Sequence, residues 1–504
     1  MSDAVYNLGG LVDAANDEPS RTAFIDVDAE GQSRAVSYGE LAAQAEGIAQ
    51  GLRARGLPIG DRVAVLATNS VRQVATLLGI MRAGLIAVPI NIKFPRALIH
   101  DVLIDSGAQL VFHDTARQSV VPAGYQTVAL DGQPWLDFQA PGASPAWRPA
   151  PQAPALMLYT SGSTGRPKGV LLSHEGQLWT VRARQKQTPL DAERALIAAP
   201  LYHMNALALS LLVLACRATA VLLPQFTASS YIRAISEHRC TWLTAVPPMI
   251  AMMLRERELL AESDLSSVRA VRMGSAPVSP SLLAQLHNLL PSARVINAYG
   301  TTEGGPVVFG PHPQGVPTPA LSVGYPQPGV DIRLLAGPDD PPGVGVLAMR
   351  SPGLMLGYHQ RPDLPPPFTE DGFFITGDVF QRDEQGFYTF VGRRDDMFVC
   401  GGENIHPGDV ERMLERHPAV QQACVVPISD DIKGAKPVAF VVTRSGQQLD
   451  EDTLKRYALE NAPVYQHPRH VWFVAELPLA ATNKIDRKRL QHEVAERIMA
   501  KVSV

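Results

Sequence analysis

The central part of the chain alternates short runs of β-branched and apolar residues with helical patterns. A helix is predicted over 71–82, and another starts where Ser279, a good N-cap, is followed by Pro280. Strands are predicted over residues 62–67, 85–90, 156–159, 195–199, 220–223, 242–246, 268–273 and 293–298. This alternation is typical of parallel β-sheets covered by helices. Ligands of such sheets bind beside the carboxyl ends of the strands, so we expect the chemistry in the loops that leave those ends.

The pattern of the sequence changes after about residue 324. Residues 337–367 are dense in glycine and proline, which indicates a small β-rich subdomain over about 324–394. Beyond residue 395 the pattern predicts a helix, two strands, a helix and a strand over 408–416, 421–427, 437–443, 452–460 and 470–475. We therefore expect an α/β protein. Its large N-terminal domain over 1–394 would hold two helix-covered sheets and the β-rich subdomain, and its small α+β C-terminal domain would cover 395–504.

Charge and cysteine content argue against several classes of protein. The 45 lysines and arginines against 49 aspartates and glutamates give a net charge of −4, so nucleic acid is not an expected partner. The four cysteines are widely spaced and form no CxxC or Cys/His pattern, so we expect neither disulfides nor a zinc site. The longest apolar run, over 206–216, is too short to span a membrane and predicts a buried helix. The first residues do not resemble a signal peptide, so we expect a cytoplasmic protein.

One segment that leaves a predicted strand has the composition of a phosphate-binding loop. It reads Leu158, Tyr159, Thr160, Ser161, Gly162, Ser163, Thr164, Gly165, Arg166, Pro167, Lys168 and Gly169. Glycines let backbone N–H groups approach an oxyanion, hydroxyls add donors, and Lys168 with Arg166 adds positive charge. The segment is not a Walker A loop, because Pro167 rather than glycine precedes Lys168. The alternative is a flexible turn without a ligand.

This segment resembles the phosphate-binding signature of the adenylate-forming superfamily, which includes acyl-CoA synthetases, firefly-type luciferases and the adenylation domains of peptide synthetases. Four more motifs agree with that family in the same order along the chain. They are Asn297-Ala298-Tyr299-Gly300-Thr301-Thr302-Glu303, Phe374-Ile375-Thr376-Gly377-Asp378-Val379, Val391-Gly392-Arg393-Arg394-Asp395-Asp396 and Asn483-Lys484-Ile485-Asp486. Taken singly, Glu303 and Asp378 are typical of surface carboxylates and Lys484 of a solvated lysine. Their joint order is what indicates a site, and the chain is most similar to free-standing aryl- or fatty-acyl-CoA ligases.

The resemblance implies an ATP site with Mg²⁺. The phosphates are expected at Thr160, Ser161, Gly162, Ser163, Thr164, Gly165 and Lys168. The adenine is expected at Asn297, Ala298, Tyr299, Gly300, Thr301 and Thr302, with Gly274, Ser275, Ala276 and Pro277 packing on it and on the floor of the acyl pocket. Glu303 is expected to hold Mg²⁺, Asp378 to accept hydrogen bonds from the ribose hydroxyls, and Arg393 to contact the nucleotide.

The reaction of this family explains why these residue types are needed. A carboxylate must attack the α-phosphorus of ATP although both are anionic, so Mg²⁺ on Glu303 and the loop of Thr160 would screen the approach. Lys484 is expected to hold the carboxylate against the α-phosphate. The mobile C-terminal domain is then expected to turn at a hinge, Asp395, which removes Lys484. The turn would bring Gly401 and Gly402 to a tunnel for the thiol of coenzyme A.

The acyl pocket is expected beside His203, which matches the family histidine between the acyl group and the adenylate. A lone histidine in an apolar segment is otherwise usually a packed core residue. The lining is predicted as Met204, Asn205, Leu207, Val246 and Met249, with space left by Gly304 and Gly305. Asn205 is expected to bond either a substrate hydroxyl or a backbone group. The segments expected around the pocket hold no arginine or lysine, so we predict a monocarboxylic acid, aromatic or arylpropenoic, with a medium-chain fatty acid as the alternative.

Other branches of the superfamily remain as alternatives. Only about twenty residues follow Lys484, so no carrier domain is expected, which favours a free-standing CoA ligase over a peptide-synthetase module. A luciferase-type oxygenase shares every motif, and an enzyme with an acceptor other than CoA is a further alternative. A relative that only senses nucleotides would be expected to lack Lys484 or Glu303. Residues 465–468 lack the lysine common in the family, which leaves contacts to CoA open, and we expect a monomer or a homodimer.

Overall fold

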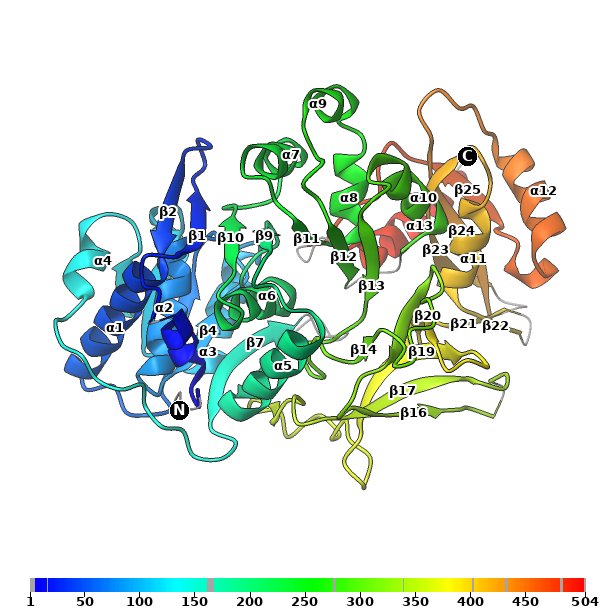
Figure 1. The fold of residues 1–504 in the computed structure, drawn as a ribbon. Helices are drawn as coiled ribbons and strands as arrows, with labels where there is room; N and C mark the ends of the chain where they lie inside the picture. Colours follow the sequence, from blue (N-terminus) through cyan, green and yellow to red (C-terminus); the bar gives the residue numbers. More distant parts are fainter. Residues whose placement is uncertain are drawn as a thin grey trace.

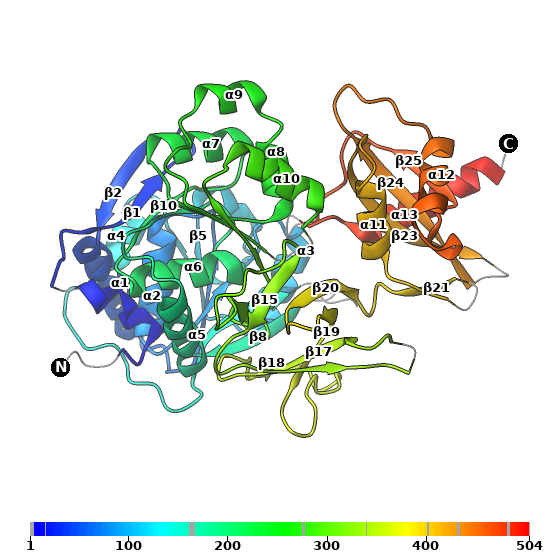
Figure 2. The same ribbon diagram turned by 45° about the vertical axis from the view of Figure 1, so that its right-hand side comes forward.

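The chain folds into four parts. The computed structural model describes residues 5–15, 17–160, 167–274, 278–338, 340–400, 403–430, 434–480 and 484–502. Figure 1 shows two helix-covered sheets, a β-rich part drawn in yellow, and a C-terminal domain drawn in orange and red. Figure 2 shows that the C-terminal domain lies to one side of the other three parts. The predicted α/β class with a separate small domain is therefore confirmed.

The first sheet has seven strands in the order β13, β12, β11, β9, β10, β1, β2. Their bounds are Arg294–Ala298, Ala270–Gly274, Trp242–Ala245, Arg194–Ile197, Thr219–Leu222, Thr22–Val27 and Ser33–Ser37. All neighbours are parallel except β1 and β2. The helices of this part are α5, α6, α7, α8, α9 and α10, over His174–Gln187, Met204–Ala215, Ala228–Glu237, Pro247–Met253, Arg257–Glu262 and Pro280–Leu289.

The second sheet also has seven strands, in the order β18, β8, β7, β4, β3, β5, β6. Their bounds are Gly357–Tyr358, Lys168–Ser173, Pro154–Thr160, Ile86–Pro89, Arg62–Leu66, Leu110–His113 and Gln126–Ala129. The helices that precede α5 in the chain are η1, α1, α2, α3, η2 and α4, over Leu8–Ala15, Tyr38–Ala54, Val71–Arg82, Arg96–Ser106, Thr115–Val120 and Gln133–Phe138. One continuous apolar core contains residues of both sheets and of α1, α2 and α6.

Local sequence signals explain where several of these helices begin. Helix α2 has the predicted bounds, and the side chain of its N-cap Ser70 accepts a hydrogen bond from the backbone N–H of Gln73. Helix α10 begins after Ser279, whose side chain accepts from the N–H of Leu282. The apolar run over 206–216 forms α6, which is buried on nearly all sides. In the described part of the chain, no helix is long and apolar enough to cross a membrane.

The β-rich part is an antiparallel sheet of six strands in the order β14, β15, β20, β19, β17, β16. They cover Phe309–Gly310, Ser322–Pro326, Tyr388–Arg393, Phe374–Arg382, Val344–Arg350 and Asp331–Leu335. This agrees with the subdomain predicted from the density of glycine and proline.

The C-terminal domain has two apolar layers, one on each face of a sheet. Its strands β21, β22, β23, β24 and β25 cover Phe398–Cys400, Glu403–Ile405, Val420–Asp430, Gly434–Thr443 and His470–Phe473. Its helices α11, α12, η3 and α13 cover Pro407–Glu415, Glu451–Asn461, Val464–Gln466 and Arg487–Val502. Helix α13 has no counterpart among the predicted elements, whereas the helix, strands, helix and strand predicted before it are all present.

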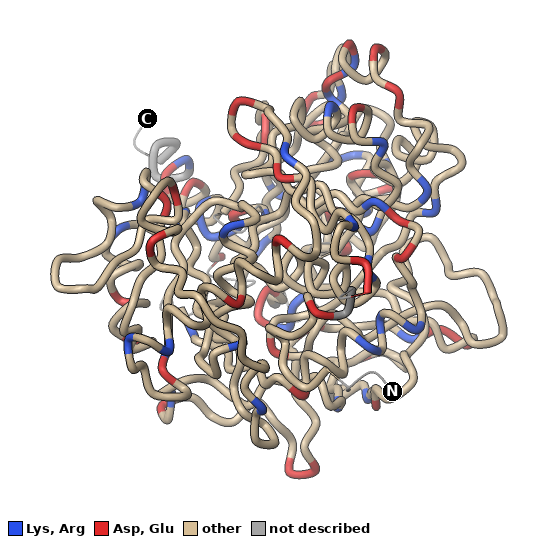
Figure 3. The backbone as a smooth tube through the Cα atoms, turned by 60° about the vertical axis from the view of Figure 1, so that its left-hand side comes forward, with Lys and Arg blue, Asp and Glu red and all other residues tan. Residues whose placement is uncertain are grey.

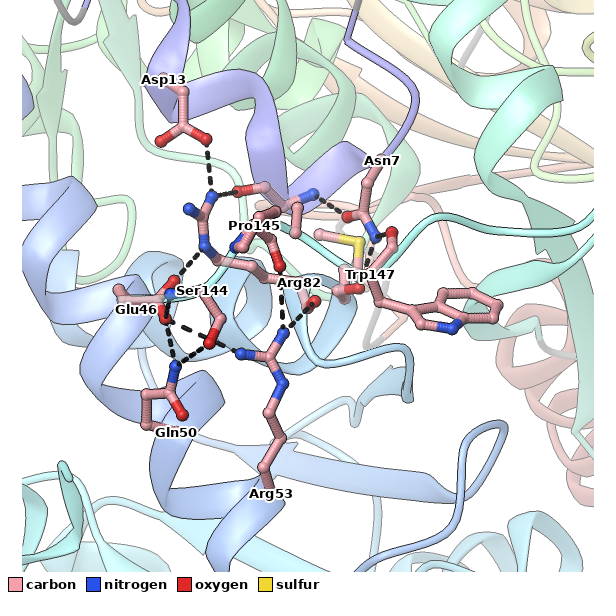
Figure 4. A network of polar contacts seen from close by, with 12 residues as sticks. Asn7, Asp13, Glu46, Gln50, Arg53, Arg82, Ser144, Pro145 and Trp147 are labelled. Carbon is pink, nitrogen blue, oxygen red and sulfur yellow. Dashed lines mark hydrogen bonds and ion pairs between the residues drawn. The ribbon is translucent and has the colours of Figure 1, made fainter. Parts of the chain in front are cut away.

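A polar network fixes the N-terminal segment against the first two helices (Figure 4). The Arg82 guanidinium at the end of α2 donates to Asp13 Oδ2 at 2.7 Å and to Glu46 Oε2 at 2.5 Å. The amide nitrogen of Asn7 donates to the carbonyl of Trp147 at 2.8 Å. These bonds join η1, α1, α2 and the segment that leads into β7. Elsewhere charges of both signs are interspersed along the backbone (Figure 3).

Candidate active site

Asp378 is a buried carboxylate, and its hydrogen bonds join the β-rich part to the loop after β13 of the first sheet. It lies on β19 opposite Arg393 of β20, whose Nη1 donates to Asp378 Oδ1 at 3.0 Å. The Tyr299 hydroxyl, from the loop after β13, donates to the other carboxylate oxygen at 2.5 Å. Asp378 is 5% exposed, and burial raises its pKa, while Arg393, Tyr299 and Lys484 all act to lower it. The carboxylate is thus held in a fixed orientation by donors from two separate motifs.

Glu303 lies on the loop that follows Tyr299 and faces β18. Its Oε1 accepts a hydrogen bond of 3.0 Å from the hydroxyl of Tyr358. The ring of the same tyrosine lies 4.5 Å from the ammonium of Lys168, which begins β8. Tyr358 therefore links the carboxylate expected to hold Mg²⁺ with the lysine expected to contact the phosphates.

Thr160 ends β7, directly opposite Lys168 in the β7–β8 hairpin. Its hydroxyl oxygen is buried and has no hydrogen-bond partner among the described residues. Buried hydroxyls are normally bonded, so this one is available to a ligand. The predicted phosphate-loop residues Ser161, Gly162, Ser163, Thr164 and Gly165 lie outside the described residues.

The residues around Glu303 fit a magnesium ion. Mg²⁺ is usually bound by one or two carboxylates together with substrate phosphates and water, not by a cage of protein ligands. Glu303 offers one carboxylate with a free oxygen, and the unpaired Thr160 hydroxyl lies on the hairpin that leads into the phosphate loop. Within the described ranges no group of three or more metal-binding side chains is present.

Lys484 comes from the C-terminal domain and lies beside the acidic groups of the N-terminal domain. Its turn is closed by backbone bonds from Ala480 N–H to the Lys484 carbonyl, 2.7 Å, and from Asp486 N–H to the Pro478 carbonyl, 2.8 Å. Burial lowers the pKa of Lys484 and Arg393 lowers it further, whereas Asp378 and Glu303 raise it. The ammonium is therefore within electrostatic range of three predicted site residues.

His203 is the N-cap residue of α6 and is held in a neutral form. Burial lowers its pKa to about 4, and the nearby ammonium groups of Lys484 and Lys93 act in the same direction. Its ring packs edge-on against Tyr202 at 4.6 Å, and its Nε2 is buried without a partner among the described residues. A neutral histidine in this position can donate or accept a hydrogen bond without adding charge.

Two residues of the predicted acyl-pocket lining have different neighbours on α6. Asn205 lies in the first turn of α6, and its Oδ1 accepts a long hydrogen bond of 3.5 Å from Nη1 of Arg272 on β12. Leu207 lines a small apolar void against α2 together with Val74 and Leu211. Met249 is 1% exposed and packs in the core that also contains Met273, on the other face of the first sheet from Arg272.

Packing and backbone conformation explain why glycine occupies the two positions after Glu303. A Cβ at Gly304 would lie 2.7 Å from the sulfur of Met349, and Gly305 has a φ of 78°, which favours glycine. Gly304 therefore permits close packing against Met349 of the β-rich part. Met204 directly precedes Asn205 and is 8% exposed. Val246 directly follows β11 and is 7% exposed.

The remaining adenine-loop residues lie at the ends of β12 and β13. Gly274 approaches β13 closely, because a Cβ there would lie 2.8 Å from the Ala298 carbonyl oxygen. The side chain of Asn297 donates to the Leu321 carbonyl at 2.9 Å, and Thr301 Oγ1 accepts from the N–H of Gly304 at 2.7 Å. Ser275, Ala276, Pro277, Gly401 and Gly402 lie outside the described residues.

With this geometry in place, comparison with known proteins identifies the family. The sequence model of the AMP-binding enzyme family matches residues 11–359, and that of the AMP-binding enzyme C-terminal domain matches residues 409–484. The chain belongs to the AMP-binding enzyme family, as the order of its motifs predicted.

Individual relatives cover nearly the whole chain. The sulfoacetate–CoA ligase of Cupriavidus necator is 33% identical over 90% of this chain and 92% of its own length. The feruloyl-CoA synthase of an Amycolatopsis species is 34% identical over the same shares. The crystal structure of the anthranilate CoA ligase AuaEII in complex with anthranoyl-AMP superimposes with a TM-score of 0.88 at 25% identity, covering 97% of this chain and 98% of that one.

Sequence reasoning missed two features of the site. Tyr358 was not predicted, because it lies within the glycine-rich and proline-rich stretch of residues 337–367 and only the fold brings its hydroxyl to Glu303. Arg272 was missed because it lies in the middle of a predicted strand, two residues before Gly274, where only the fold shows which face it occupies.

Proposed function

We propose that this protein is an ATP-dependent, AMP-forming acid–CoA ligase. Membership of the AMP-binding enzyme family and the CoA-ligase names of its relatives support this activity. The observation that carries it is the position of Lys484. The lysine of the C-terminal domain lies within electrostatic range of Asp378 and Glu303 of the N-terminal part. A cation at that point is needed to bring two anions together.

The first half-reaction joins the acid to AMP. Asp378, fixed by Tyr299 and Arg393, accepts hydrogen bonds from the ribose of ATP. Lys484 holds the attacking carboxylate at the α-phosphate and neutralises the charge that develops there. When bound, Mg²⁺ screens the phosphates and stabilises the leaving pyrophosphate.

His203 forms the boundary between the adenylate and the acyl group. Because the histidine is neutral, it leaves Lys484 as the positive charge next to the attacking carboxylate. Its unpaired Nε2 offers one hydrogen bond to the bound acid or adenylate.

The second half-reaction transfers the acyl group to the thiol of CoA. We place the hinge at Asp395, which is exposed, accepts a 3.4 Å hydrogen bond from Arg393 and directly follows the N-terminal domain of residues 1–394. Rotation of the domain of residues 395–504 would withdraw Lys484 and bring Gly401 and Gly402 toward the acyl-adenylate. The four free, buried cysteines support a reducing, cytoplasmic compartment.

An assay with a panel of acids tests the activity. The protein is incubated with ATP, Mg²⁺, CoA and each acid, and AMP, pyrophosphate and thioester are measured together. The panel contains aromatic, arylpropenoic, medium-chain aliphatic and dianionic acids. We expect stoichiometric AMP and thioester with at least one acid. Adenylate without thioester for every acid would exclude CoA as the acceptor and favour a different nucleophile.

A further inference from the structure

Two arginines, one on β12 and one on α5, lie close enough for their charges to interact. Arg272 is in the middle of β12, where Val271 and Met273 point into the core on the opposite face. Arg272 therefore faces the α5–α6 side, where its guanidinium reaches Asn205. Arg184, in the last turn of α5, is close enough that its charge interacts with that of Arg272.

Neither arginine has an anionic partner among the residues that the structure describes. Arg184 is 8% exposed, and burial together with the charge of Arg272 lowers its pKa to about 9. Burial lowers the pKa of Arg272 to about 10. Both groups are cations at neutral pH. Buried charges are normally paired, because an unpaired one is costly, so two adjacent cations call for a counter-ion.

Unpaired polar atoms occur on the elements that carry or adjoin these two cations. Within the described part of the chain, buried atoms without hydrogen-bond partners include Gln177 Nε2, Thr180 Oγ1, Asn205 Nδ2, Trp242 Nε1 and Thr244 Oγ1. On α5 the spacing of Gln177, Thr180 and Arg184 places them on one face of the helix. Thr244 is the β11 partner of Arg272 in the sheet. Buried polar atoms are bonded in the great majority of cases, so this cluster has the character of a polar binding pocket.

The polar cluster lies on the acyl side of the active site. His203 is within electrostatic range of Lys484, which marks the reacting end. Two residues further along the chain, Asn205 contacts Arg272, whose charge interacts with that of Arg184. The series of neighbours therefore runs from Lys484 through His203 and Asn205 to the arginines. An acid bound by its reacting carboxylate at Lys484 would direct its other end toward Arg272.

We propose that the acid carries a second anionic group, a carboxylate or a sulfonate, which Arg272 and Arg184 bind at the far end of the pocket. This rests on the proposed ligase activity and replaces the expectation of a monocarboxylic acid. That expectation relied on the lack of arginine and lysine in the segments predicted to line the pocket. Arg272 lies outside those segments in the sequence, but its side chain reaches the pocket residue Asn205. A guanidinium binds such an oxyanion through two parallel hydrogen bonds, with Asn205 and Thr244 as further donors.

Matched pairs of acids test the proposal. The pairs are succinate and butyrate, 3-sulfopropionate and butyrate, and terephthalate and 4-methylbenzoate, so each pair differs in the second anion. In the wild-type protein, kcat/KM for AMP release is expected to be at least about 100-fold higher for the dianionic member of one pair. In Arg272→Met the ratio of kcat/KM between the two members of that pair is expected to fall to about one.

A binding measurement separates this inference from the proposed activity. Without ATP, about 10 mM succinate or 3-sulfopropionate is expected to raise the melting temperature of the wild type but not of Arg272→Met. The control Arg294→Met changes an exposed arginine on the neighbouring strand β13 and is expected to behave as wild type in both assays. The melting temperature of each unliganded variant also shows whether it is folded.

The possible outcomes distinguish the proposed anion-binding pocket from the proposed ligase activity. Stabilisation by the dianions that depends on Arg272, without AMP release from any acid, would support the pocket and overturn the ligase activity. Turnover of monocarboxylates, with dianions that neither react nor stabilise, would overturn the pocket and leave the ligase activity intact. A dianion preference that persists in both Arg272→Met and Arg184→Met would also overturn the assignment.

Discussion

The hydroxyl of Tyr299 donates a hydrogen bond of 2.5 Å to Oδ2 of Asp378. The two residues are 79 positions apart in the sequence and belong to different motifs. The bond holds the loop after β13 against β19. Arg393 donates a second hydrogen bond to the other carboxylate oxygen, Oδ1. Because the carboxylate is almost completely buried, these donors determine both its orientation and its charge.

Tyr299→Phe is expected to weaken ATP binding while the ring keeps its packing on Phe380. The loss of one hydrogen bond to a charged group is worth about 1.5 to 3 kcal/mol, so KM for ATP should rise about tenfold or more with little change in kcat. Since Tyr299 lowers the pKa of Asp378, the variant should also lose ATP affinity at a higher pH than the wild type as the pH falls. Initial rates at varied ATP and pH measure both effects, and Tyr325→Phe is the control. An unchanged KM would mean that Asp378 does not contact the nucleotide.

Removal of the Lys484 ammonium is expected to separate the two half-reactions. Lys484→Ala should slow pyrophosphate release by about 100-fold or more, because the cation acts where charge develops in the transition state. Thioester formation from supplied acyl-adenylate and CoA should be nearly unaffected. Equal losses in both steps would contradict the proposed rotation of the C-terminal domain.

The alkaline limb of the adenylation rate is expected to report the titration of Lys484. Burial lowers its pKa, so the ammonium loses its proton at a lower pH than an ordinary lysine, and the rate should fall as the pH rises through that value. Lys484→Arg keeps its charge and should shift this limb to higher pH. Rates of pyrophosphate release from pH 7 to 10.5 test this, with the thioester step as the internal control.

Arg487 is expected to be a positioning residue for the turn that carries Lys484. Its guanidinium binds both oxygens of Glu411, at 2.5 and 2.8 Å, and the carbonyl of Val425 at 2.9 Å. Arg487→Lys cannot keep this fork, so the adenylation rate should fall about tenfold while the thioester step from supplied adenylate is retained. Arg489→Lys, an exposed change two residues away, is the matched control. A parallel loss of both steps together with a lower melting temperature would indicate a structural role only.

Glu415→Gln is expected to stabilise the protein at neutral and alkaline pH. Burial raises the pKa of Glu415 from 4.5 to about 8, so the folded state resists an ionisation that the unfolded state undergoes. The stability from this group is complete below about pH 4.5 and is lost as the pH rises through about 8. One pKa unit is about 1.4 kcal/mol, and we expect a gain of about 2 kcal/mol in the free energy of unfolding at pH 8, which vanishes near pH 4. Urea denaturation at both pH values measures it, with the exposed Glu460→Gln as control; an equal gain at both pH values would contradict the linkage.

Helix caps, periodicity and β-branched runs predicted those helices and strands whose pattern lies within a single short segment of the sequence. The bounds of α2 follow from its capped, periodic sequence, and eight of the fourteen strands of the two sheets follow from their β-branched or apolar runs. Strands β1, β2, β5, β6, β8 and β18 were not predicted. The pocket face of α6 could not be predicted in the same way. That helix is apolar on nearly all sides, so periodicity does not show that Leu207 faces α2 whereas Asn205 faces Arg272.

The sequence by itself determined the family, the order of the motifs and the residues expected to carry the chemistry, because those signals are local or depend only on order along the chain. The tertiary structure decided which side chains meet. Arg272 and Asn205 are 67 positions apart and lie in segments whose own patterns predict only a strand and a buried helix. Arg272 meets Asn205 because helix α6 packs on one face of the first sheet, and Tyr299 meets Asp378 because the loop after β13 lies against β19 of the antiparallel sheet.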